Sequence, residues 1–138
     1  MNKKKQNIAI IGAGAGGLLV QEILKNNNKY NIVGFIDNLK KKKKISGLKI
    51  LGNDLIIPKL KSLNIHSAVI CVGNTTTRTK LRNICQKNKI NLASAISKET
   101  IIGRHVKLGD GCVILPGCVI FDNITIGINN WIGIGAKI

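Results

Sequence analysis

A glycine-rich turn near the N-terminus has the first spacing that could do chemistry. Gly12, Gly14 and Gly17 stand in G-x-G-x-x-G order between an aliphatic run, Ile8–Ile11, and a segment with apolar residues at helical spacing. Such glycines let a ligand approach the backbone, and the amides that open the next helix can bind an anion. Asp37 ends a second aliphatic segment about 20 residues on, where a nucleotide-binding unit places an acidic residue. The pattern predicts phosphate or nucleotide binding, and a turn that needs glycine only for its own geometry is the alternative.

A second candidate contact follows another apolar segment. Gly73-Asn74 comes directly after Ala68–Val72, which has the composition of a buried strand. Open parallel sheets bind ligands at the carboxyl ends of their strands, and an asparagine amide can hydrogen-bond a sugar hydroxyl or a base edge. A polar turn that caps the following helix explains the same residues equally well. Both interpretations stay open at this point.

The other reactive side chains form no catalytic or metal-binding pattern. His66 precedes the Ala68–Val72 strand and His105 falls in the middle of a repeat unit, so we interpret both as surface residues. None of the four cysteines has C-x-x-C spacing or a histidine nearby in the sequence: Cys71, Cys85, Cys112 and Cys118. We expect them to be reduced, buried thiols. We therefore assign no catalytic residue and expect neither a metal site nor a disulfide.

These candidate residues need a sheet and helices to position them, and the apolar periodicity indicates both. A helix follows the glycine turn to about Asn26, and a strand, Tyr30–Ile36, leads to Asp37. After it we expect an extended return over Ile45–Gly52 and a helix over Asn53–Leu63, which Asn53 caps and Pro58 disturbs. A strand over Ala68–Val72, a helix over Thr76–Asn88 and a crossover strand over Asn91–Ala95 should follow. The order predicts an α/β fold with a small Rossmann-like domain built on a parallel sheet. About three strands make less than two mononucleotide-binding halves, which favours a nucleotide sugar or mononucleotide over NAD.

The C-terminal third repeats an aliphatic residue at every sixth position. The residues are Ile96, Ile102, Leu108, Ile114, Ile120, Ile126, Ile132 and Ile138. This period fits neither a helix nor an alternating strand, but it fits a hexapeptide-repeat β-helix whose interior the aliphatics fill. Three repeats make one coil, so Ile96, Ile114 and Ile132 should stack in one column, about 4.8 Å apart. We expect two domains, a Rossmann-like nucleotide-sugar-binding domain over 1–92 and the first coils of a left-handed parallel β-helix over 93–138.

Charge and composition narrow the range of partners. The net charge is +16, yet the arginines are only Arg78, Arg82 and Arg104, and aromatic residues make up 3% of the chain. Groups that read or stack on bases are therefore scarce, so we expect no nucleic-acid partner. The positive charge favours anionic ligands such as nucleotide phosphates. No apolar run reaches the roughly 20 residues that span a bilayer, and no signal-peptide pattern is seen, so we expect a cytoplasmic protein without membrane insertion.

The order of these motifs resembles one family. A G-A-G-x-x-G turn after the first strand, F-I-D ending the second, V-G-N ending the third and then hexapeptide coils run over essentially the whole chain. They look like the sugar acetyltransferases of the sialic acid O-acetyltransferase (NeuD) and bacillosamine-pathway N-acetyltransferase (PglD) type. The resemblance implies acetyl transfer from acetyl-CoA to a nucleotide-linked or sialic-type sugar. It also implies a homotrimer, with acetyl-CoA between neighbouring prisms and a β-helix histidine as general base.

The resemblance also implies roles for individual residues. Gly12, Gly14, Ala15, Gly16 and Gly17 would contact phosphate, Asp37 and Asn38 the nucleoside, and Gly73 and Asn74 the sugar side. Two positions depart from the pattern, because many relatives have a histidine in place of Gly16 and often another in place of Ala95–Ser97. The family's catalytic histidine falls in the coil beyond Ile138. We therefore expect this chain to be incomplete and inactive in acetyl transfer.

Two functions from different classes follow from this reading. The first is a sugar acetyltransferase that is catalytically incomplete in this form. The second is a nucleotide-sugar-binding module with an oligomerising β-helix stub and no catalysis. A nicotinamide-dependent redox enzyme would need a second nucleotide-binding half, for which the sequence before Ile96 has no room.

Overall fold

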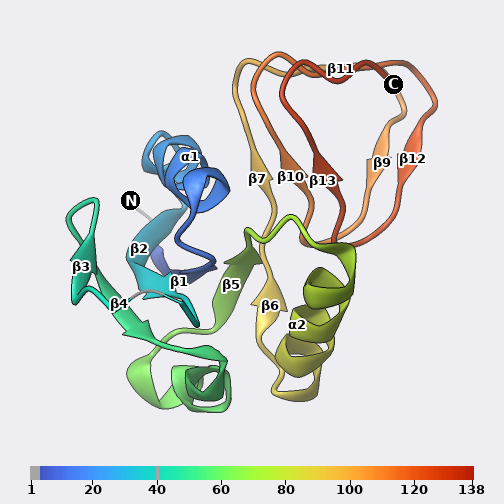
Figure 1. Cartoon of the computed structure of the whole chain (residues 1–138). Helices are drawn as coiled ribbons and strands as arrows, with labels where there is room; N and C mark the ends of the chain where they lie inside the picture. Colours follow the sequence, from blue (N-terminus) through green and yellow to red (C-terminus); the bar gives the residue numbers. More distant parts are fainter. Residues whose placement is uncertain (1–3, 40) are drawn as a thin grey trace.

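A mostly parallel six-stranded sheet forms the N-terminal part of the chain, and a triangular prism of short strands follows it (Figure 1). The computed structural model describes residues 4–39 and 41–138. Its elements in chain order are β1 (Gln6–Ile11), α1 (Ala15–Lys25), β2 (Tyr30–Ile36), β3 (Lys44–Ile45), β4 (Leu48–Gly52), η1 (Asp54–Leu63), β5 (Ser67–Ile70), α2 (Thr75–Lys87), β6 (Asn91–Leu92), β7 (Ala95–Ile96), β8 (Ile101–Ile102), β9 (Lys107–Leu108), β10 (Val113–Ile114), β11 (Val119–Ile120), β12 (Thr125–Ile126) and β13 (Trp131–Ile132). This order confirms the α/β class, with a parallel sheet followed by the start of a β-helix.

β1 lies at the centre of the sheet because it is apolar on both faces. The strand order is β3-β4-β2-β1-β5-β6, and β2 and β5 both run parallel to β1. Its Ile8–Ile11 segment is at most 2% exposed, as a strand covered on both faces requires. Val20 and Leu24 of α1 pack on one face, while Ile57 of η1 and Leu81 of α2 pack on the other. The sheet is therefore the layer that positions every turn at its edges.

Two segments differ from the predicted elements. The extended return is a hairpin in which β3 pairs antiparallel with β4, turning through Ser46 and Gly47, both at positive φ. The helix that Asn53 begins is a 3-10 helix, although the predicted cap is present: Leu55 N donates to Asn53 Oδ1 at 2.9 Å. Pro58 lies inside this helix and has no N–H to donate to an α-helical ladder, which favours the tighter form.

The prism confirms the six-residue period residue by residue. β10 pairs in parallel with both β7 and β13, so Ile114 lies between Ile96 and Ile132 in one column. Equivalent pairs join β8 to β11 and β9 to β12, which makes three faces. Ile114 is fully buried, whereas Ile96 is 39% exposed. Stacking of neighbouring coils is therefore what removes the aliphatic column from water.

The corners of the prism depend on a second repeat, which the six-residue aliphatic ladder does not reveal. The residue three positions after each aliphatic from Ile102 to Ile132 has a positive φ, between 57° and 78°, at six successive corners: His105, Gly111, Gly117, Asn123, Asn129 and Gly135. Glycine and asparagine adopt this left-handed conformation most readily. His105 is therefore a corner residue, and it is exposed, as predicted.

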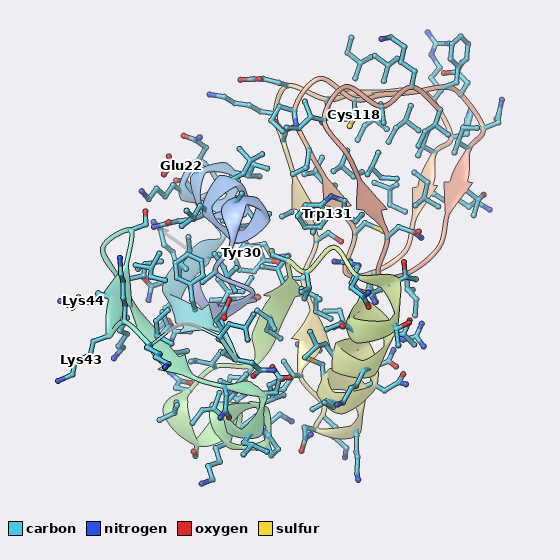
Figure 2. All side chains as sticks on the ribbon, in the orientation of Figure 1. Glu22, Tyr30, Lys43, Lys44, Cys118 and Trp131 are labelled. Carbon is cyan, nitrogen blue, oxygen red and sulfur yellow. The ribbon has the colours of Figure 1, made fainter. Side chains whose placement is uncertain are left out.

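The cysteines are buried and unpaired, as predicted. In the prism the Cys112 thiol donates to Gly127 O at 3.1 Å, and the Cys118 thiol, inside the prism in Figure 2, donates to Gly133 O at 3.0 Å. Burial raises the pKa of the Cys71 thiol well above its ordinary range and, with a smaller effect from Asp54, raises that of Cys85 to about 11. These two thiols stay protonated at neutral pH, so neither is a nucleophile.

None of the described helices combines the length and the apolar composition needed to cross a membrane.

Replacement of Ile114 by alanine should lower the free energy of unfolding by about 2–5 kcal/mol, because it leaves a cavity between two coils. Ile134 is a matched control, since it lies in the same prism and is 71% exposed. Its replacement by alanine should change stability by less than about 0.5 kcal/mol. Urea unfolding followed by the fluorescence of the single tryptophan measures both. Equal effects of the two substitutions would contradict the stacked interior.

Iodoacetamide at pH 8 should leave all four cysteines of the folded protein unmodified and should label all four in urea. The reason is burial, reinforced at Cys71 and Cys85 by the raised thiol pKa. Mass spectrometry of the intact chain counts the adducts. Labelling of Cys112 or Cys118 before unfolding would show that the prism interior opens.

Candidate functional site

The two ligand turns predicted from the sequence lie side by side at one edge of the sheet. β1 and β5 are parallel neighbours, so the turn of Gly12–Gly17 and the turn of Gly73-Asn74 both begin at carboxyl ends of strands. The chain passes from β1 to β2 on one side, and β5 pairs with β1 on the other. This reversal of direction is the switch point at which open α/β sheets bind their ligands.

Gly12 is required by the fold itself. Its φ is +112°, and a Cβ at this position would lie 2.5 Å from the carbonyl oxygen of Cys71, at the end of β5. The Gly12 amide donates to Ile36 O at 2.7 Å, which ties the turn to β2 as well. Gly17 is also forced, because a Cβ there would overlap the Gly12 carbonyl. These two glycines support the structural interpretation of the motif.

At positions 14 and 73, by contrast, nothing within the protein requires glycine. Both have an ordinary backbone φ, and a Cβ built on either meets no atom within 4 Å. Each is exposed, at the carboxyl end of β1 or of β5. Open space above two adjacent glycine turns is the geometry that lets a ligand approach the backbone.

The start of α1 has the character of an anion site. Gly14 is the N-cap and offers no side chain, and the first turn has no acidic residue. The first intrahelical bond runs from Leu18 N to Gly14 O at 3.0 Å, so the amides of Ala15, Gly16 and Gly17 precede the hydrogen-bonded part of the helix. These amides and the helix dipole favour a negatively charged group.

Asp37 joins the glycine turn to the loop after β2. Its carboxylate accepts from Ala13 N at 2.8 Å through Oδ2 and from Leu39 N at 2.8 Å through Oδ1. Asn38 is held by Asp54, because its Nδ2 donates to Asp54 Oδ2 at 2.8 Å and its Oδ1 accepts from Asp54 N at 2.9 Å. The structure thus brings Asp37 to the turn and orients Asn38 toward the start of η1.

Asn74 caps α2. Its Oδ1 accepts from Thr77 N at 2.9 Å and from Thr77 Oγ1 at 3.1 Å. Of the two interpretations of Gly73-Asn74, the cap is present in the structure, and it occupies the amide oxygen. Gly73, the residue before it, stays open to solvent.

Three residues with no predicted role in a site lie over the same edge. Arg78 of α2 and Asn129 and Trp131 of the prism line a cavity of about 350 Å³ together with Gly73. Trp131 lies between the prism and α1 (Figure 2), and a Cβ on Gly16 would come within 2.6 Å of its Cη2. The one sequence feature that could have pointed to Trp131 is that it is the single tryptophan of a chain poor in aromatic residues. Nothing in the local pattern indicated that α2 meets a residue 51 positions away.

Arg78 is the one arginine that the fold buries, at 4% exposed. Burial lowers the pKa of its guanidinium, which nevertheless stays charged at neutral pH. Its N–H groups donate to carbonyls at the end of β5 and to Asn129, and its guanidinium carbon lies 5.6 Å from the Trp131 ring centroid. A fixed positive charge therefore lies beside the Gly73 turn.

The histidines lie away from this edge. His66 precedes β5, and with Asn7, Asn64 and Asn91 it lines a cavity at the opposite, amino edge of the sheet. His105 is a prism corner. Within the described ranges, no group of three or more His, Cys, Asp or Glu side chains is placed to hold a metal ion. The site can therefore bind and orient an anionic ligand with backbone amides, and the described residues assemble no acid–base pair.

Comparison with known proteins identifies one family and several solved structures of similar fold. Residues 7–84 match the PglD N-terminal domain family. No curated protein matches the chain. A mutant of perosamine N-acetyltransferase from Caulobacter crescentus, in complex with CoA and GDP-perosamine, is 24% identical over 96% of this chain and 62% of its own, with a TM-score of 0.89.

Two further solved structures have the same fold. The acetyltransferase domain of PglB from Neisseria gonorrhoeae, in complex with acetyl coenzyme A, is 20% identical over 98% of this chain and 65% of its own, with a TM-score of 0.87. WeeI from Acinetobacter baumannii is 24% identical over 95% of this chain and 62% of its own, with a TM-score of 0.75. The chain thus spans less than two thirds of the length of these three proteins. Since the family match covers more than half of the chain, the chain belongs to the PglD N-terminal domain family, as the order of its motifs predicted.

Proposed function

We propose that this chain is the nucleotide-sugar-binding part, with the first prism coils, of an acetyl-CoA-dependent acetyltransferase that modifies a nucleotide-linked or sialic-type amino sugar. The observation that carries the proposal is the pair of open glycines, Gly14 and Gly73, at adjacent strand ends beside unbonded helix amides. Perosamine N-acetyltransferase, which shares the fold, was crystallised with CoA and GDP-perosamine. We take 1–92 as the nucleotide-sugar domain and 93–138 as the prism domain.

The proposed ligand lies along the carboxyl edge of the sheet. Its diphosphate meets the turn of Gly12, Gly14, Ala15, Gly16 and Gly17, where amides and helix dipole offset the negative charge. Asp37 and Asn38 lie on the nucleoside side. Asp37, whose carboxylate holds the turn through Ala13 N, is the proposed acceptor for a ribose hydroxyl. Gly73 and Asn74 lie on the sugar side.

Two exposed leucines suit the nucleoside end of this ligand. Leu39 is 88% and Leu55 is 79% exposed, and each directly follows one partner of the Asn38–Asp54 pair. Ligand sites are lined mostly by apolar side chains with a few polar groups among them. The position of these leucines supports a nucleobase at this end of the ligand and the sugar at the other end.

Acetyl transfer requires a base to take a proton from the sugar amine as its nitrogen attacks the thioester carbon. We propose that 1–138 bind and orient the sugar but do not transfer acetyl by themselves, because His66 and His105 both lie away from the site. In this respect the chain acts as a nucleotide-sugar-binding module, the second of our hypotheses. Acetyl-CoA is the co-substrate of the proposed transfer.

A homotrimer and a cytoplasmic location belong to the same proposal. Large apolar side chains are exposed on the prism, among them Ile101 at 67% and Phe121 at 72%. Exposed apolar surface of this kind favours association with further copies. The four unpaired cysteines fit a reducing compartment such as the cytoplasm.

Alanine at Gly14 or Gly73 should weaken binding of a GDP- or UDP-linked amino sugar by about tenfold or more, because a Cβ would stand where the ligand approaches. Neither change should cost more than about 1 kcal/mol of stability. Calorimetric titration and urea unfolding measure the two effects. Gly133, which is equally open but lies in the prism, is the matched control, and its replacement by alanine should leave affinity unchanged. Unchanged affinity in all three variants would remove the ligand interpretation.

Incubation of the chain with acetyl-CoA and the same amino sugars should release no free CoA thiol, while calorimetry on that sample detects sugar binding. The reason is the absence of a base beside the site among the described residues. A thiol reagent follows the release. Release above the rate of spontaneous hydrolysis would mean that these residues include a base that the geometry does not reveal.

A further inference from the structure

Arg78 links the candidate site to the prism with every hydrogen that its guanidinium can donate. Nη1 donates to Ile70 O at 2.7 Å and to Val72 O at 3.3 Å, both at the end of β5. Nε and Nη2 donate to Asn129 O at 3.3 and 3.0 Å, and Nη2 also donates to Asn129 Oδ1 at 2.9 Å. A guanidinium has five N–H groups, and these five bonds use all of them.

Asn129 also donates a hydrogen bond to Arg78. Its Nδ2 donates to Arg78 O at 3.1 Å, so the two residues exchange side-chain and main-chain bonds. Its φ of 57° is that of a prism corner, and the corner stacked before it is Gly111. The corner itself therefore needs only a residue that tolerates this conformation. The asparagine amide is explained by the bonds to Arg78.

Trp131 carries the same contact to the other ligand turn. The Arg78 guanidinium lies 5.6 Å from the centroid of its ring, which is cation–π distance. The far edge of the ring lies where a side chain at Gly16 would be. The third coil thus touches the glycine turn through Trp131 and the Gly73 turn through Arg78.

The charge of Arg78 argues against a role in stability alone. Among the described residues no carboxylate pairs with it, and all its acceptors are neutral. Burial of an unpaired charge carries a desolvation cost that apolar packing at the same place would avoid. What a guanidinium adds is a planar, rigid fork that fixes direction at several acceptors at once.

We propose that Arg78 and Asn129 are positioning residues that hold the third prism coil against both ligand turns, with Trp131 as the contact that senses the glycine turn. This inference rests on the proposed function, since it names what sets the sugar relative to the prism on which acetyl transfer takes place. Neither residue touches the reacting atoms. They act by fixing the position of the prism relative to the bound sugar.

The test uses the single tryptophan as a reporter of the prism edge and circular dichroism at 222 nm as a reporter of α1 and α2. In the unmodified chain both signals should change at one urea concentration, because the contact couples the two parts. Asn129→Gly keeps the corner conformation and removes the amide, and Arg78→Lys keeps the charge and removes the fork. In both variants the tryptophan signal should change first.

The matched controls are Asn123→Gly and Arg82→Lys. Asn123 is a corner with φ 64°, and the side chain of Arg82, on α2, bonds within the described residues to Asn83 alone. Both controls should unfold in one coincident transition. Separation of the two signals in the controls, or coincidence in Asn129→Gly and in Arg78→Lys, would overturn the positioning role.

A ligand readout separates positioning from stability. In the unmodified chain a GDP- or UDP-linked amino sugar should change the Trp131 emission. In folded Asn129→Gly that change should be lost while calorimetric affinity stays within about threefold. An emission change equal to that of the unmodified chain would overturn the proposal. Absence of any binding heat in the unmodified chain would instead refute the proposed function, and the unfolding comparison would still decide whether Arg78 and Asn129 join the domains.

Discussion

The backbones at the carboxyl ends of β1 and β5 lie in direct contact, and the candidate site depends on this contact. Cys71 N donates to Ile11 O at 2.7 Å, so the strands stay paired to their last residues. Gly12 then passes so close to the Cys71 carbonyl that no side chain fits. Both ligand turns therefore leave the sheet from one point, and a molecule bound at the start of α1 also lies beside Gly73. A site assembled this way consists of main-chain groups, which explains why it offers amides and open space more than reactive side chains.

The prism contributes side chains to the sheet edge, which consists mainly of main-chain groups. Its interior positions are set by stacking, and its corners are set by a left-handed backbone conformation. Asn129 satisfies the corner conformation, with φ 57°, and its side chain also bonds to Arg78 of α2. Trp131 opens the strand that follows, and its ring lies beside Gly16 of α1. The prism thereby adds an amide and an aromatic ring to an edge that the sheet supplies with glycine, and Arg78 joins the two parts.

Periodicity predicted the elements because burial in this chain is regular. Each of these elements repeats one kind of buried contact: the aliphatic runs of β1 and β2, and the six-residue ladder through Ile114. A contact that repeats at regular spacing requires the same type of residue at that spacing, which the sequence shows directly. The β3–β4 hairpin and the 3-10 form of η1 lack that signal, since they depend on single turn residues such as Gly47 and Pro58. The Arg78–Asn129 pair was missed for a related reason. It is a single contact between segments that follow different periods, and neither period marks it.

The side chains at positions 16 and 131 cannot be chosen independently. The resemblance to sugar acetyltransferases implied a histidine at position 16 in many relatives, and this chain has glycine there. The structure gives the physical reason, because a Cβ on Gly16 would lie 2.6 Å from Trp131 Cη2 and 3.0 Å from Cζ2. In the observed arrangement the Trp131 ring therefore occupies the space that a side chain at position 16 would need. In this chain the volume beside the first turn of α1 is filled by Trp131, and this contact joins the glycine turn to the prism.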